Sequence, residues 1–148
     1  SGFDAITIAI DSLNYLETEQ QIRETFKEVH AALNEGGHFF FDVHSLHKVD
    51  HIYMDSPFVY DGEDISYIWH TAEGDSEHSV IHDLTFFIRN GEFFERFEET
   101  HEQRTFPIAQ YSAWLSDAGF EVMEVTADFT DEKPVDDSER IFFHACKK

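Results

Sequence analysis

Two short apolar runs, each followed by polar residues, constrain most strongly what this chain can fold into. They cover residues 3–10 and 38–43. Such runs are typical of strands buried on both faces, which belong to parallel sheets flanked by helices. In open α/β sheets, ligands bind just beyond the carboxyl ends of the strands. We therefore expect residues 11–15 and 42–45 to lie at the rim of a binding crevice.

The segment between the two runs predicts a helix over residues 17–34. Thr18 with Gln21 three positions later matches a capping box, and Gly36-Gly37 ends the helix. Apolar residues recur along it at spacings of four, three and four positions: Ile22, Phe26, Val29 and Leu33. A strand, a crossover helix and a second strand predict a βαβ unit with parallel strands.

The middle of the chain has a different character. Residues 65–71, 78–89 and 92–106 alternate between apolar and polar side chains, and Asn90-Gly91 is a strong hairpin signal. These runs predict an antiparallel meander, which we interpret as an insertion over residues 46–106 that covers the crevice.

The last third returns to the α/β pattern. Pro107 opens a predicted helix, in which Tyr111 and Trp114 are expected to be core residues. Residues 121–129 and 139–146 predict two further strands, joined by an acidic loop. An antiparallel last strand beside a parallel core is common in mixed sheets.

Charge narrows the classes of partner. The chain has 31 acidic and 10 basic residues, for a formal net charge of −21. A surface this acidic repels nucleic-acid phosphates and anionic membranes, so nucleic acid is disfavoured as a substrate. Cys146 is the only cysteine, which fits a reducing cytoplasm. No apolar stretch approaches the ~20 residues that span a membrane.

The order and spacing of these motifs resemble those of a known enzyme family. The chain resembles the class I S-adenosylmethionine-dependent methyltransferases from their fourth strand onward, and is most similar to a group of uncharacterised bacterial methyltransferases. The matching segments are residues 3–7, 11–15, the helix running into Gly36-Gly37 and strand 38–42, the helix that ends in Ala118-Gly119-Phe120, and the closing strand 140–145.

The resemblance implies an α/β fold that is the C-terminal part of a Rossmann-like sheet. Residues 1–45 and 107–148 would form the core, and the insertion over residues 46–106 a lid on the substrate side. S-adenosylmethionine would be the cofactor, with a small molecule or a protein as the acceptor. The family's glycine-rich loop is absent, since no Gly-x-Gly occurs in the sequence. The chain would therefore be the portion that follows the cofactor loop.

Two groups of candidate site residues follow from this resemblance. The segment after the first strand corresponds to a motif beside the transferable methyl group, and its cofactor-binding candidates are Asp11, Ser12, Asn14 and Tyr15. The substrate-binding candidates lie at the next strand end and on the meander: His44, Tyr67, Trp69, His70 and Arg104. His44 could also act as a base, and Arg104 could clamp a carboxylate. Helix capping, sheet packing and a surface ion pair are the alternative roles.

Other interpretations stay open. The chain could be a non-catalytic acidic α/β module that binds a basic partner, or it could form a homodimer through an exposed sheet edge. His44, His47 and His51 have helical spacing, but ten histidines produce such spacings by chance. We assign no metal site and no catalytic residue from the sequence.

Overall fold

The computed structural model describes residues 2–148, which form two four-stranded sheets. The first, called the core sheet, has the strand order β1-β2-β8-β7. Strands β1 and β2 are parallel, whereas β8 is antiparallel to both of its neighbours. The bounds are β1 Phe3–Ile8, β2 Leu33–His44, β7 Phe120–Ala127 and β8 Arg140–Lys147. The α/β architecture expected from the sequence is confirmed.

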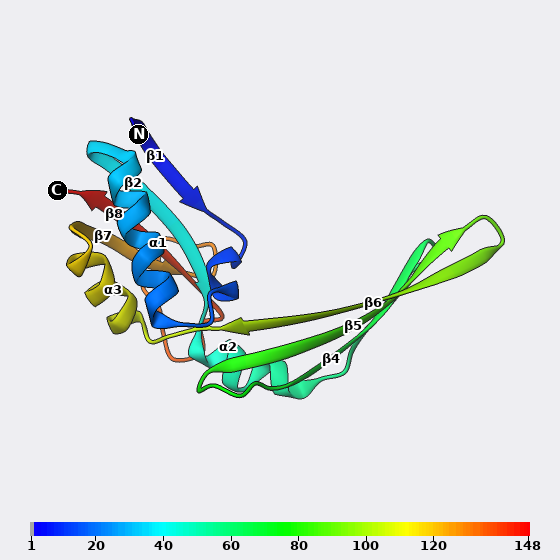
Figure 1. The fold of residues 1–148 in the computed structure, drawn as a ribbon. Helices are drawn as coiled ribbons and strands as arrows, with labels where there is room; N and C mark the ends of the chain where they lie inside the picture. Colours follow the sequence, from blue (N-terminus) through cyan, green and yellow to red (C-terminus); the bar gives the residue numbers. More distant parts are fainter. Residues whose placement is uncertain (1) are drawn as a thin grey trace.

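Two helices cover one face of the core sheet (Figure 1). They are α1, Glu19–Ala32, and α3, Ile108–Asp117. Their apolar stripes pack on alternate residues of β2 and β8, so that the Phe41 and Phe143 rings stack 4.7 Å apart beneath Tyr111. Tyr111 and Trp114 are buried core residues, as predicted.

The opposite face of the core sheet differs from the expectation of strands buried on both sides. Phe40 is exposed and stacks on His144 at 4.5 Å, and most residues of the edge strand β1 are exposed. The reason is that α1 and α3 lie on the same side, and no other helix among residues 2–148 packs on this face.

The first helix is confirmed with shifted ends. Thr18 and Gln21 form the predicted capping box, in which the Thr18 side chain accepts from the Gln21 amide. The helix ends at Ala32, and β2 begins at Leu33 rather than at residue 38.

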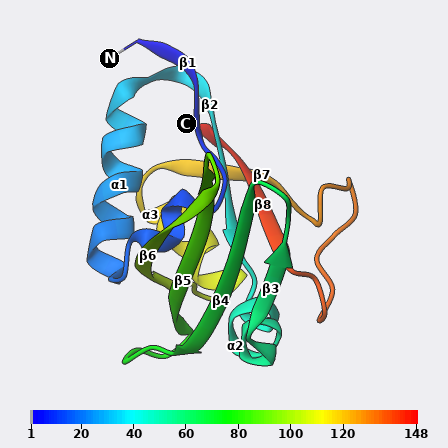
Figure 2. The ribbon, with the colours of Figure 1, turned by 90° about the vertical axis from the view of Figure 1, so that its right-hand side faces the viewer.

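The second sheet, called the arm, has the strand order β3-β4-β5-β6, and all of its strand pairs are antiparallel. Figure 2, which looks toward the arm, shows the four strands side by side. The hairpin predicted between β5 and β6 is present, but its two-residue loop is Gly91-Glu92, one position later than predicted, because Asn90 still pairs with Phe93. Gly91 has φ +65°. The bounds are β3 Phe58–Asp61, β4 Ile65–Glu73, β5 Ser79–Asn90 and β6 Phe93–Arg104.

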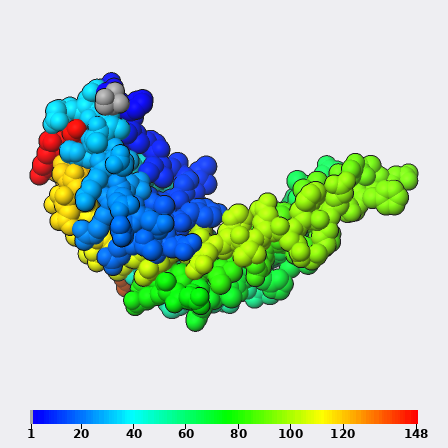
Figure 3. Space-filling model, in the orientation of Figure 1, coloured from blue at the N-terminus to red at the C-terminus, as the bar shows by residue number. Residues whose placement is uncertain are grey.

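The arm projects away from the core and contacts it only at its base (Figure 3). There α2, Leu46–Asp50, and the 3-10 turn η2, Ile52–Asp55, place Val49 and Tyr53 against Val80 in a small second core. No helix among the residues that the structure describes is long and apolar enough to cross a membrane.

Candidate functional site

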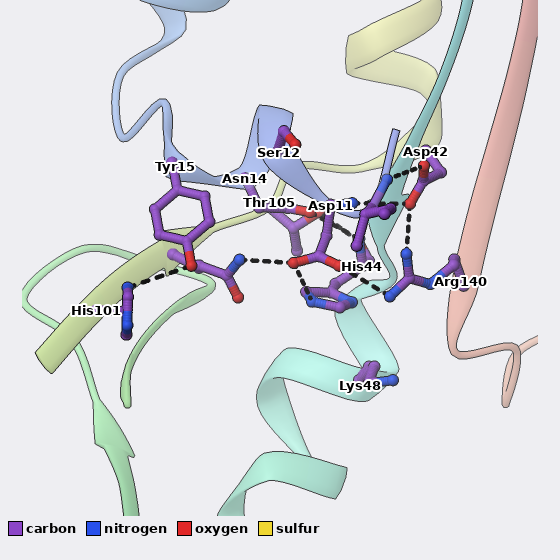
Figure 4. A network of polar contacts seen from close by, with 12 residues as sticks. Asp11, Ser12, Asn14, Tyr15, Asp42, His44, Lys48, His101, Thr105 and Arg140 are labelled. Atoms are coloured by element: carbon purple, nitrogen blue, oxygen red, sulfur yellow. Dashed lines mark hydrogen bonds and ion pairs between the residues drawn. The ribbon is translucent and has the colours of Figure 1, made fainter. Parts of the chain in front are cut away.

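The site begins at the carboxyl end of β1, where the chain makes a left-handed turn. Ile10 and Asp11 have φ values of 60° and 48°, a region that non-glycine residues rarely adopt. Asp42, on the neighbouring strand β2, stabilises this turn. Its carboxylate accepts from the amides of Ile10 and Asp11 at 2.8 and 2.9 Å. The turn directs the Asp11 carboxylate toward the arm (Figure 4).

Arg140, at the start of β8, bridges two carboxylates. Its guanidinium donates to Asp11 at 2.9 Å and to Asp42 at 2.5 Å. Asp11 also lies 3.4 Å from Nε2 of His44. Burial by itself would raise the pKa of Asp11, but the hydrogen bonds from His44, Gln103 and Arg140 hold it well below its ordinary value. Asp11 is therefore a fixed negative charge at neutral pH.

A chain of hydrogen bonds runs from the arm to Asp11. The indole Nε1 of Trp69 donates to Nδ1 of His82 at 3.1 Å. Because Nδ1 accepts, Nε2 of His82 carries the hydrogen and donates to the Gln103 amide oxygen at 3.1 Å. The Gln103 amide nitrogen then donates to Asp11 at 2.8 Å. Burial lowers the pKa of His82 to about 4, so this ring is neutral at neutral pH.

A cavity of about 380 Å³ lies where the arm meets the core. This volume is within the usual range of small-molecule sites. Its lining comes from both sheets and from the segments between them: Asp11, Tyr15, His44, Lys48, Tyr53, Trp69, His82, Leu84, His101, Gln103 and Arg140. The cavity is at the carboxyl ends of β1 and β2, the rim at which the sequence predicts a crevice.

Two of the four predicted cofactor residues, Asp11 and Tyr15, line this cavity. The Ser12 hydroxyl instead donates to the Ala9 carbonyl at 2.6 Å. Asn14 is fully buried, and both ends of its side-chain amide are occupied. It donates to the Arg104 carbonyl at 2.8 Å and accepts from the His44 amide at 2.9 Å. Asn14 thus ties the core to the base of the arm. Cofactor contacts by all four residues stay predictions.

Among the predicted substrate residues, His44 and Trp69 line the cavity. Nε2 of His44 lies 3.1 Å from the Tyr53 hydroxyl, and its Nδ1 is buried without a hydrogen-bond partner among the described residues. Tyr67 occupies the same face of β4 as Trp69, two residues farther out along the arm. His70 is exposed and lies on the opposite face of that strand.

Arg104 does not reach a carboxylate in this structure. Its guanidinium donates to the backbone carbonyls of Glu77 and Glu17 at 3.0 and 2.9 Å. It also lies 4.5 Å from the centre of the Phe106 ring. These bonds hold two loops together, and a role in substrate binding stays a prediction.

The sequence did not identify five residues that build the site: Tyr53, His82, His101, Gln103 and Arg140. A signal existed for His82, which is a polar residue on the otherwise apolar face of an alternating strand. The other four have no local pattern that identifies them, because their roles depend on contacts between distant segments.

The histidines with helical spacing do not gather around one point. His44 faces the cavity, whereas His47 and His51 pack against each other at 5.4 Å. Among the described residues, no group of three or more His, Cys, Asp or Glu side chains is arranged to hold a metal ion.

Comparisons with known proteins agree with this architecture. No protein-family model matches the chain. It is 52% identical over 145 residues to the Bacillus subtilis protein named "Putative methyltransferase YqeM", covering 98% of this chain and 59% of that protein. A similarly named protein of Geobacillus sp. (strain WCH70) is 51% identical over 148 residues, with 99% of this chain and 60% of that protein covered. The chain thus spans about 60% of the length of these curated relatives.

A solved structure extends the likeness to three dimensions. The crystal structure of an S-adenosylmethionine-dependent methyltransferase from Clostridium acetobutylicum superposes with a TM-score of 0.92 at 30% identity. The match covers 99% of this chain and 58% of that one. The resemblance to S-adenosylmethionine-dependent methyltransferases predicted from the sequence is therefore confirmed over almost the whole chain.

Proposed function

We propose that the full-length protein transfers a methyl group from S-adenosylmethionine to a small molecule, and that this chain supplies the acceptor side of the site. The observation that carries the proposal is the cavity between core and arm, into which polar groups from both sheets converge. Since the chain spans about 60% of its curated relatives, the remaining part of the protein would complete the cofactor site.

The shape of the cavity favours a small acceptor over a protein. The lining residues come from the segment after β1, the end of β2, the helical turns α2 and η2, the arm and the start of β8, so the cavity has walls on several sides. Trp69 and Leu84 supply apolar surface, while Tyr15, Tyr53 and His101 supply groups that can hydrogen-bond. A few placed polar groups in a partly apolar hollow are typical of small-molecule sites.

The chemistry of the cavity also fits the cofactor. S-adenosylmethionine supplies an electrophilic methyl group on a positively charged sulfonium. Asp11 is a fixed carboxylate here, and the half-exposed ring of Tyr15 offers an aromatic face; both stabilise a nearby cation. Arg140 and Gln103 hold the Asp11 carboxylate in place, so its position is preorganised.

The test starts with the cofactor. We expect the full-length protein to bind S-adenosylmethionine by isothermal titration calorimetry, and to transfer a radiolabelled methyl group to at least one compound from a panel of small phenols, alcohols and amines. Replacement of the cavity-lining indole by Trp69→Ala should raise KM for that acceptor about fivefold, because aromatic contacts contribute about 1 kcal/mol beyond area burial.

His70→Ala is the matched control, since His70 is the next residue on the same strand and faces away from the cavity. Absence of S-adenosylmethionine binding would refute the proposal. Equal KM values for the Trp69 and His70 variants would show that the acceptor does not bind in this cavity.

The alternative of a non-catalytic acidic module for a basic partner is not favoured, because the relatives are named as methyltransferases. A cytoplasmic location, the action of the arm as a lid and a homodimer through the free edge of β1 all stay predictions.

A further inference from the structure

Three side chains at the mouth of the cavity form a second hydrogen-bonded chain between core and arm. The Tyr15 hydroxyl lies 3.3 Å from Nδ1 of His101, and Nε2 of His101 lies 3.0 Å from a carboxylate oxygen of Glu99. Tyr15 belongs to the 3-10 turn after β1, whereas His101 and Glu99 share one face of β6. Figure 4 shows the Tyr15 and His101 side chains meeting across the gap between the two sheets.

The protons of this chain can be assigned from its chemistry. The Glu99 carboxylate can only accept, so Nε2 of His101 carries a hydrogen. In the neutral ring, Nδ1 then has a free lone pair, which accepts from the Tyr15 hydroxyl. Burial, together with the negative charges of Asp11 and Glu99, raises the pKa of Tyr15, so the phenol remains protonated at neutral pH. The three groups thus form a directed path from a hydroxyl in the cavity to a carboxylate outside it.

Other titratable groups in the cavity are less suited to accept a proton. The Asp11 carboxylate is engaged by Arg140 and Gln103. Both ring nitrogens of His82 are hydrogen-bonded. The free nitrogen of His44, Nδ1, is fully buried. His101, by contrast, has about a third of its side chain exposed and lines the cavity.

We propose that Tyr15 and His101 take the proton from the methyl acceptor, with Glu99 as the residue that positions His101. This inference rests on the proposed function and narrows the acceptor to a molecule whose reacting oxygen or nitrogen carries a hydrogen. Such atoms become better nucleophiles as the proton leaves.

The proposed step balances. A lone pair of the acceptor heteroatom forms the bond to the methyl carbon, and the sulfonium sulfur retains the electron pair of the bond that breaks. The acceptor proton passes to the Tyr15 oxygen while the Tyr15 proton passes to Nδ1 of His101. The imidazolium that results is stabilised by the Glu99 carboxylate, 3.0 Å away.

Several other groups surround His101 and bear on its protonation. His82 is its direct cross-strand partner on β5, and Gln103 follows on the same face of β6. Tyr15 and Asp11 approach from the core side of the cavity. Because the pKa of His82 is about 4, this ring is neutral at neutral pH and adds no positive charge next to His101.

The first test needs no substrate. In full-length protein labelled with 15N-histidine, we expect NMR to show the neutral His101 ring with hydrogen on Nε2 and none on Nδ1. In Glu99→Gln, the fraction of this tautomer should fall, because a glutamine side chain can also donate. Glu98→Gln is the matched control, since it makes the same charge change on the opposite face of β6. A ring protonated on Nδ1, or equal tautomer fractions in the two variants, would overturn the relay.

The second test uses the acceptor found in the panel described above. Tyr15→Phe and His101→Gln should each lower kcat about 100-fold, a usual contribution of proton transfer, with little change in KM. Glu98→Gln, on the opposite face of β6, should retain the kcat of the parent protein. Unchanged kcat in both relay variants would refute the inference while leaving methyl transfer intact. A protein that methylates no compound would refute the proposed function. The tautomer measurement would still decide whether the hydrogen bonds from Tyr15 through His101 to Glu99 exist.

Discussion

At the scale of single residues, Arg140 is the cation on which the site depends. It is 17% exposed and holds the carboxylates of Asp11 and Asp42, at 2.9 and 2.5 Å. Without it, two negative charges would face each other in a partly buried position. We expect Arg140→Met to lower the free energy of unfolding by about 3 kcal/mol, which urea unfolding of the full-length protein would measure. Arg23→Met, which breaks an exposed pair with Asp117, should cost less than about 1 kcal/mol.

The contact between Arg140 and Asp11 also makes the stability of the protein depend on pH. The pKa of Asp11 is lower in the folded protein than in the unfolded chain, where it is about 4. Asp11 therefore contributes stability above pH ~4, which is lost as the pH falls through the folded value. In Arg140→Met the folded pKa rises, so part of this loss should move to higher pH. An unfolding curve with the same acid dependence in both proteins would contradict the assignment.

The sequence predicts site residues well where a strand end identifies them. Asp11, Tyr15 and His44 follow the two apolar runs, and all three line the cavity. Gln103 and Arg140 could not be found in this way. Each meets Asp11 from a segment more than 90 positions away, and nothing in their local pattern shows which residue they will meet.

At the scale of elements, the alternation of apolar and polar side chains and the Asn90-Gly91 turn signal predict β4, β5 and β6. The alternation runs without interruption on both sides of this turn signal. Strand β3 was missed, since four residues at the edge of a sheet are too few for a period to be recognised. The start of β2 was also placed late. Residues 33–37 contain two glycines and read as the end of a helix, but Leu33 is already extended.

Gly91 offers a test at this scale. It adopts φ +65°, and a β-carbon added there would meet no atom within 4 Å. The cost of Gly91→Ala is therefore backbone strain alone, about 1 kcal/mol in the unfolding free energy. Gly91→Asn should cost less, because asparagine tolerates the left-handed region better. Amide exchange should become faster at the hairpin tip in the alanine variant. Equal stability of the two variants would indicate that the turn has a different geometry.

At the scale of the whole molecule, two hydrogen-bonded chains join the arm to the core. One runs from Trp69 through His82 and Gln103 to Asp11, and the other from Tyr15 to Glu99. The packing that accompanies them is small, since the second core around Val49, Tyr53 and Val80 lies on the arm side. We infer that these polar contacts, more than apolar burial, fix the direction in which the arm projects.

This inference predicts that Gln103→Leu widens the range of arm positions. Spin labels at Glu28→Cys on α1 and Glu92→Cys at the arm tip, with other cysteines replaced, would report the core-to-tip distance by double electron–electron resonance. We expect a broader distribution in Gln103→Leu, because Asp11 loses its only bond from β6 and His82 loses its acceptor. Gln20→Leu, the same exchange on the exposed surface of α1, is the control. If both variants keep the narrow distribution of the parent, the bonds of Gln103 do not fix the direction of the arm, and the cavity would keep its shape without them.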